Sequence, residues 1–100
     1  MRWLPSLGLA LVISVLCAFP AWAGTTTVAV RDNSFRPAVV GVVQGSRVVW
    51  VNRGRDNHTV TTRRWSVVLN PGERHVRRVR HGFRYVCAYH GAMTGRVVIR

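Results

Sequence analysis

The feature that most constrains the fold of this chain is a series of short β-prone runs separated by turn residues. From residue 25 onward, runs rich in Val, Thr and aromatic residues recur about every eight to twelve residues. No apolar spacing of three to four residues, the mark of an amphipathic helix, continues through them. Seven strands are predicted, with segment 63–69 left unassigned, over residues 25–31, 38–43, 47–52, 58–62, 74–80, 83–87 and 95–100. The pattern predicts one all-β domain, a sandwich or a small barrel.

Local details of two segments follow from the same reasoning. Along 74–80 the arginines are expected to point outward, and Val76 and Val79 inward. Because this alternation slips between Arg77 and Arg78, a β-bulge is predicted there. Segment 88–94 is expected to be a loop.

The N-terminus has the pattern of a cleaved secretory signal peptide. Arg2 provides a positive start, residues 4–19 are mostly apolar, and Ala21-Trp22-Ala23 is a small-x-small cleavage pattern. The alternative is a transmembrane anchor, but the apolar run is short for a span of about 20 residues. Cleavage after Ala23 would leave residues 24–100 as a single exported domain, in the periplasm or elsewhere outside the cytoplasm.

Cysteine usage points to a metal. After cleavage only Cys87 would remain, so no internal disulfide is possible, and the thiol is either buried and inert or bound to something. Small exported domains usually need a disulfide or a metal to compensate for a small core. His90 and Met93 follow Cys87 at intervals of three residues. Thiolate, imidazole and thioether together suit a copper ion that cycles between two oxidation states.

A second histidine would complete such a site. His58 is the candidate, because it begins a predicted strand directly after a polar loop. His75 and His81 are the competitors, and both are expected to be solvated among arginines or in a turn. The residues therefore predict one copper ion held by His58, Cys87, His90 and Met93.

A wider set of residues resembles the plastocyanin-like cupredoxins, and the ligand loop is most similar to that of amicyanin. The matching motifs, in order, are Phe35-x-Pro37, Gly45-x-x-Val48-x-Trp50-x-Asn52, His58-Thr59-Val60, Leu69-x-Pro71-Gly72 and Gly82-Phe83-x-Tyr85-x-Cys87-x-x-His90-x-x-Met93-x-Gly95-x-Val97. The resemblance implies a Greek-key β-sandwich, a type 1 mononuclear copper site and an electron-carrier role.

The resemblance also assigns roles to individual residues. It implies that His58, Cys87 and His90 are equatorial ligands and that Met93 is the axial ligand. Asn52 matches an asparagine whose amide holds the ligand loop by hydrogen bonds in this family. The alternative for Asn52 is an ordinary loop-capping asparagine.

Charge bears on the choice of partner. The chain has 15 basic residues, all arginine, against three acidic residues, and a net charge of +12. This field favours redox partner proteins with an acidic docking surface, or else the arginines simply cover the solvent face. No nucleic-acid motif is present, and contact with membrane lipid is expected to be peripheral only. The predicted docking surface of this monomer is apolar and contains Trp65, Ala88, Tyr89, His90, Gly91 and Ala92.

Three functions remain open from the sequence. The first is electron transfer without catalysis, since four protein ligands leave a metal no open position for substrate. The alternative is a periplasmic copper chaperone or resistance protein that uses the same site. The third is a metal-free sandwich that binds envelope polyanions through its arginines, in which case Cys87 would be dispensable.

Overall fold

The computed structural model describes residues 23–100. The predicted signal peptide therefore lies outside the described residues, apart from Ala23 at its expected end. Within residues 23–100 every regular element is a strand. No helix in that range is long and apolar enough to cross a membrane.

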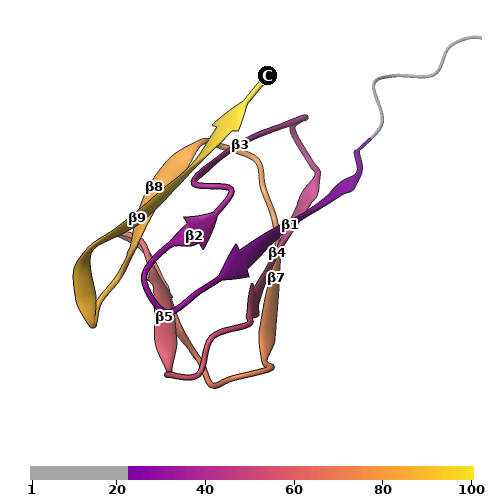
Figure 1. Cartoon of the computed structure of the whole chain (residues 1–100). Helices are drawn as coiled ribbons and strands as arrows, with labels where there is room; N and C mark the ends of the chain where they lie inside the picture. Colours follow the sequence, from indigo (N-terminus) through magenta and orange to yellow (C-terminus); the bar gives the residue numbers. More distant parts are fainter. Residues whose placement is uncertain (1–22) are drawn as a thin grey trace, which may run out of the picture.

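Nine strands form two sheets (Figure 1). They are β1 (Thr25–Val30), β2 (Phe35–Arg36), β3 (Val39–Val42), β4 (Arg47–Asn52), β5 (His58–Thr61), β6 (Ser66–Leu69), β7 (Arg74–Arg78), β8 (Phe83–Cys87) and β9 (His90–Ile99). The first sheet has the order β2-β1-β4-β7, and the second has the order β3-β9-β8-β5-β6. Both sheets are mixed, because β1 runs parallel to β4 and β3 runs parallel to β9.

The core lies between the two sheets, which confirms the predicted all-β sandwich. β1 and β4 contribute Val28 and Trp50, and both side chains are fully buried. The second sheet contributes Tyr85, whose ring meets that of Trp50 edge to face with centroids 5.5 Å apart. Phe35 packs against the same tyrosine at 4.7 Å. Aromatic pairs of this kind contribute about 0.5–1.5 kcal/mol beyond the burial of their area, so Tyr85 helps to hold the two sheets together.

The structure contains two strands, β2 and β6, that were not predicted. β2 has only two residues, which pair with the end of β1, and so short a run carries no periodic signal. β6 lies in the segment left unassigned and pairs antiparallel with β5 from His58↔Leu69 to Thr61↔Ser66. Its residues become a strand because β5 offers an open edge, which is a property of the tertiary fold.

The predicted facing of β7 is wrong. Val76 is 46% exposed, whereas His75 and Arg77 are half-buried. The predicted bulge is also not there, since the pairing of β7 with β4 is continuous from Arg47↔Arg78 to Val51↔Arg74. Val79 is buried as expected, but it lies beyond the end of the strand. His75, Arg77 and Val79 therefore share the inward face, and Val76 and Arg78 share the outward face, so the alternation does not slip.

The loop predicted for 88–94 is instead a tight hairpin. Ala88 and Tyr89 form its turn, and β9 begins at His90 directly opposite Cys87. A register irregularity lies between Val86 and Cys87. Bulges change the direction of side chains next to functional sites. This hairpin therefore sets how the side chains of Cys87 and His90 are oriented toward each other.

Candidate metal centre

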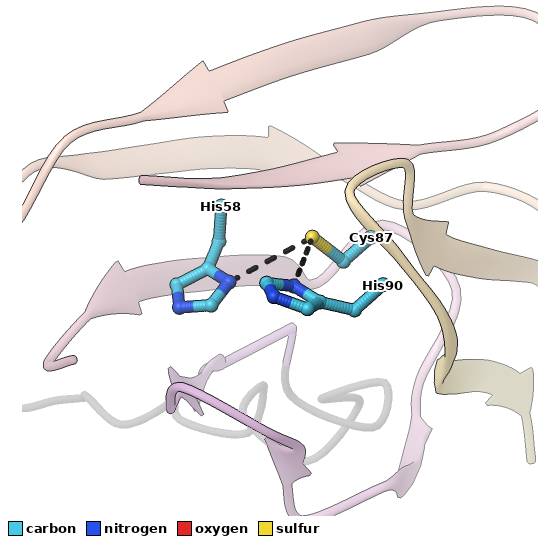
Figure 2. A group of neighbouring side chains, drawn as sticks. All are labelled: His58, Cys87 and His90. Carbon is cyan, nitrogen blue, oxygen red and sulfur yellow. Dashed lines mark hydrogen bonds between the residues drawn. The ribbon is translucent and has the colours of Figure 1, made fainter. Parts of the chain in front are cut away.

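Three side chains that were predicted as ligands converge at one end of the sandwich (Figure 2). The ligand atoms of His58, Cys87 and His90 all lie within 4.8 Å of one another. The Sγ of Cys87 is 3.7 Å from Nδ1 of His58 and 3.6 Å from Nδ1 of His90. Both imidazole rings thus point the same type of nitrogen at a single sulfur atom.

Three neighbouring strands of the second sheet supply these residues, with His90 at the start of β9. His58 begins β5, and Cys87 ends β8, the strand next to it in the sheet. His90 faces Cys87 across the two-residue turn. His58 and Cys87 are fully buried, while His90 is exposed. The site therefore has a shielded interior and one ring that reaches the surface.

Met93 lies on the core side of β9. Its side chain is 2% exposed and belongs to the same buried cluster as Cys87. From Met93 onward the strand alternates, so that Gly95 and Val97 are also buried, and Thr94 and Arg96 are exposed. The two-residue period of a strand thus turns the predicted axial ligand inward.

Thr59 connects β5 to the turn that follows Cys87, a role that sequence reasoning missed. Its backbone N–H donates a hydrogen bond to the Sγ of Cys87 at 3.4 Å. Its hydroxyl Oγ1 accepts a hydrogen bond from the backbone N–H of Ala88 at 2.7 Å. The one available signal was its position immediately after His58.

Asp32 is a second residue that the sequence interpretation overlooked. Its Oδ1 lies 3.0 Å from Nε2 of the buried His58 ring. The same carboxylate accepts hydrogen bonds from the backbone N–H groups of Arg55 and Asp56, at 2.8 and 3.1 Å. A carboxylate at Nε2 favours a proton on that nitrogen, so that Nδ1 would be the atom to bind a metal. A possible signal was that Asp32 is one of only three acidic residues in the chain.

These contacts set the ionisation of the site. Burial opposes ionisation of Cys87, but the Thr59 N–H and the two histidines outweigh it and lower the pKa of the thiol to about 6. Burial also acts to lower the pKa of His58, yet hydrogen bonds to Asp32 and Cys87 raise it overall. The hydrogen bond with His58, followed by those from the backbone, lowers the pKa of Asp32. At neutral pH the sulfur is therefore mostly thiolate, the form that binds metals.

Asn52 forms hydrogen bonds on two sides of His58. Its buried amide Nδ2 donates hydrogen bonds to the carbonyl oxygens of Asp56 and Leu69, at 2.8 and 2.7 Å. Its Oδ1 accepts a hydrogen bond from the N–H of Gly54 at 2.8 Å. These bonds tie Asn52 both to the loop that precedes His58 and to Leu69, the β6 residue paired with His58, while Thr59 contacts the turn after Cys87.

The competing histidines lie elsewhere. His81 is exposed, as predicted. The expectation that His75 is solvated is wrong, because its ring is half-buried and lies 5.5 Å from Trp65 and 6.3 Å from Trp50. Trp65 itself does not belong to the predicted docking surface. It lies in the turn between β5 and β6, at the Thr61 end of β5, whereas His58 is at the other end of that strand.

Replacing Asp32 with asparagine is expected to weaken Cu(II) binding by about 10- to 100-fold, the usual effect of losing a partner of a metal-binding histidine. Asparagine keeps an acceptor near Nε2 but removes the negative charge that makes the imidazole a stronger donor. A chelator competition measures the affinity, and voltammetry should show a higher reduction potential because Cu(II) loses more stabilisation than Cu(I).

Asp56→Asn is the matched control for this substitution. Asp56 lies in the loop between β4 and β5 and is exposed, and its backbone N–H, not its carboxylate, contacts Asp32. Its replacement changes the net charge equally and should leave the affinity within about twofold. Equal losses in the two variants would show that net charge, and not the contact with His58, is responsible.

Comparison with known proteins identifies the fold. No protein-family model matches the chain, and no curated protein sequence matches it. Among solved structures, a purple cupredoxin from Nitrosopumilus maritimus is 16% identical with a TM-score of 0.69, covering 75% of this chain and 99% of that protein. A reduced amicyanin variant is 19% identical with a TM-score of 0.67, covering 76% and 82% of the two chains. An amicyanin variant in the Cu(I) form is 17% identical with the same TM-score and coverage. The chain therefore has the fold of the cupredoxins.

Proposed function

We propose that this chain is an exported blue-copper protein that carries single electrons and does not act as an enzyme. One copper ion would be bound by His58, Cys87 and His90 in a trigonal plane, with Met93 as the axial ligand. The observation that carries the proposal is that two imidazole Nδ1 atoms lie 3.6 and 3.7 Å from one thiolate sulfur.

The spacing of these atoms fits a first-row transition metal. Bonds of about 2.0–2.1 Å to imidazole and about 2.3 Å to thiolate, the values for zinc, place nitrogen and sulfur about 3.7 Å apart at trigonal angles. A set of two histidines, one cysteine and a weak thioether is the donor set of blue-copper sites. Bound copper would supply the change between Cu(I) and Cu(II).

The protein's own residues would prepare the site for that ion. Cys87 is already a thiolate at neutral pH, and the Thr59 N–H stabilises its charge. Asp32 holds the proton of His58 on Nε2 and so aims Nδ1 at the sulfur. Because this arrangement exists before metal binds, little reorganisation would be needed when the charge of the ion changes.

Electron exchange would occur at the exposed edge of His90. We define the His90 face as the exposed residues Ala88, Tyr89, His90, Gly91 and Ala92. It is small and largely apolar, as brief docking requires, since weak encounters of redox partners bury little area. The positive net charge would attract an acidic partner protein at low salt.

One equivalent of Cu(II) added to the purified protein tests the proposal. An electron carrier should bind the ion, develop an intense blue colour from the Cu–thiolate bond, and give a reversible one-electron wave in voltammetry. A copper chaperone would instead release the ion readily to a modest chelator. A colourless protein with no voltammetric wave would contradict the electron-transfer function.

A further inference from the structure

A second feature of the molecule lies away from the metal centre. A groove of about 950 Å³ lies beside the β5–β6 turn, the β7–β8 connection and β8. Its lining follows β8 from Phe83 to Val86, and it includes none of the residues 87–92. The groove is therefore separate from the His90 face.

The rim of this groove carries unusual charge. Six of its lining residues are arginines, and none is acidic: Arg63, Arg64, Arg77, Arg78, Arg80 and Arg84. The three acidic residues of the chain lie elsewhere, because Asp32 and Asp56 are next to the metal centre and Glu73 precedes β7. The groove thus concentrates positive charge that no neighbouring carboxylate balances.

The floor of the groove is apolar and aromatic. Trp65 and Phe83 line it, and their rings meet edge to face at 5.8 Å. The guanidinium of Arg77 stacks on the Trp65 ring, 3.9 Å from its centroid. Its Nε donates a hydrogen bond to Nε2 of His75 at 3.4 Å, and stacking leaves the terminal N–H groups of a guanidinium available for an incoming anion. An occupant should therefore offer both negative charge and an apolar side chain.

We propose that this groove binds an acidic segment of a partner protein, in which carboxylates flank an apolar or aromatic side chain. Guanidinium groups pair with carboxylates through two parallel hydrogen bonds, and here they border a floor that would bury the central side chain. Arginines spread along the rim suit several carboxylates on an extended chain better than one compact anion. A bare polyanion would leave the aromatic floor unused.

The proposal is independent of the metal, although it specifies the kind of partner that the proposed electron carrier would use. Binding of a peptide to the groove requires no copper and no redox reaction. Failure of the peptide to bind would therefore say nothing against the metal centre. Failure of the protein to turn blue would say nothing against the groove.

Fluorescence anisotropy with a labelled peptide tests the groove. The probe has three glutamates on each side of a central phenylalanine, and it is titrated with the copper-treated protein at 150 mM salt. Two control peptides replace either all glutamates by glutamine or the phenylalanine by glycine. Each replacement should weaken binding by about tenfold or more. Hydrogen bonds to charged groups contribute about 1.5–3 kcal/mol, and burial of an aromatic side chain contributes about as much.

Paired arginine variants separate the groove from the overall charge. Arg64→Gln with Arg84→Gln removes two rim charges, and Arg36→Gln with Arg47→Gln removes two exposed charges that lie outside the groove. The rim pair should weaken binding of the acidic peptide at least tenfold, and the control pair less than about twofold at this salt concentration. Thermal unfolding of both pairs checks that they fold.

Several results would overturn the proposal. Equal weakening by the groove variant and the control variant would show that the net positive charge, and not the groove, causes binding. If the acidic peptide does not bind the parent protein, the groove is not a binding site for it. Equal affinity for the phenylalanine and glycine peptides would show that the aromatic floor is not used. A single-stranded oligonucleotide that binds more tightly than the acidic peptide would identify a polyphosphate as the ligand.

Discussion

Replacing Cys87 with serine is expected to abolish the blue colour completely and to lower the affinity for Cu(II) by at least about a thousandfold. The hydroxyl of serine is not ionised at neutral pH, whereas the thiol of Cys87 has a pKa of about 6. The variant would thus lose the anionic ligand that lies between His58 and His90. It would also lose the soft sulfur donor that stabilises Cu(I).

The measurement combines a visible spectrum after one equivalent of Cu(II) with chelator competition and voltammetry. His81→Gln is the matched control, because His81 is exposed in the turn before β8 and lies outside the group of three side chains. That variant should retain full colour and an unchanged potential. A serine variant that stays blue, or a His81 variant that loses its colour, would contradict the assigned ligand set.

The second large effect is expected on stability. Gly95→Ala should lower the free energy of unfolding by about 3 kcal/mol, the upper end of the usual cost of overpacking. A Cβ atom at residue 95 would collide with the ring and hydroxyl of Tyr85. The ring cannot easily move aside, since it is 1% exposed and packs edge to face against Phe35 and Trp50.

Gly91→Ala on the same strand controls for the change in backbone freedom. Nothing lies within 4 Å of a Cβ built at residue 91, so this variant should unfold within about 0.5 kcal/mol of the parent. Urea denaturation of the metal-free proteins measures both. A loss of less than about 1 kcal/mol for Gly95→Ala would mean that the tyrosine ring relaxes at little cost.

The two effects are linked through β8. Tyr85 anchors the centre of the core, and Cys87 two residues later carries the sulfur of the metal centre. Because alternate residues of a strand point to the same face, both side chains are directed into the sandwich. Packing around Tyr85 therefore helps to fix the position and orientation of the Cys87 side chain relative to His58.

The sequence was sufficient for the features that depend on local pattern. Short β-prone runs predicted the all-β sandwich, and β4 and β8 begin and end at the predicted residues. The spacing of Cys87, His90 and Met93 predicted that one short segment brings several candidate ligands together, and the structure folds its start as a two-residue turn. His58 could be selected over His75 and His81 because only it begins a strand after a polar loop, and the structure brings it to the sulfur.

Errors arose where partners distant in sequence decide the outcome. The facing of β7 depends on its pairing with β4, and β6 is a strand only because β5 lies beside it. His75 is half-buried because Trp50 and Trp65 surround its ring. No local periodicity contains this information, since the same run of residues can face either way until a neighbouring strand fixes its register.

The amino-acid sequence by itself thus predicted the fold class and selected His58, Cys87 and His90, the three side chains that the structure brings together. Only the tertiary structure decided how those donors are held. Asp32 reaches His58 from 26 residues away, and Thr59 reaches Cys87 from 28 residues away. The physical reason is that hydrogen bonds act over about 3 Å in space, and only folding brings such distant segments that close.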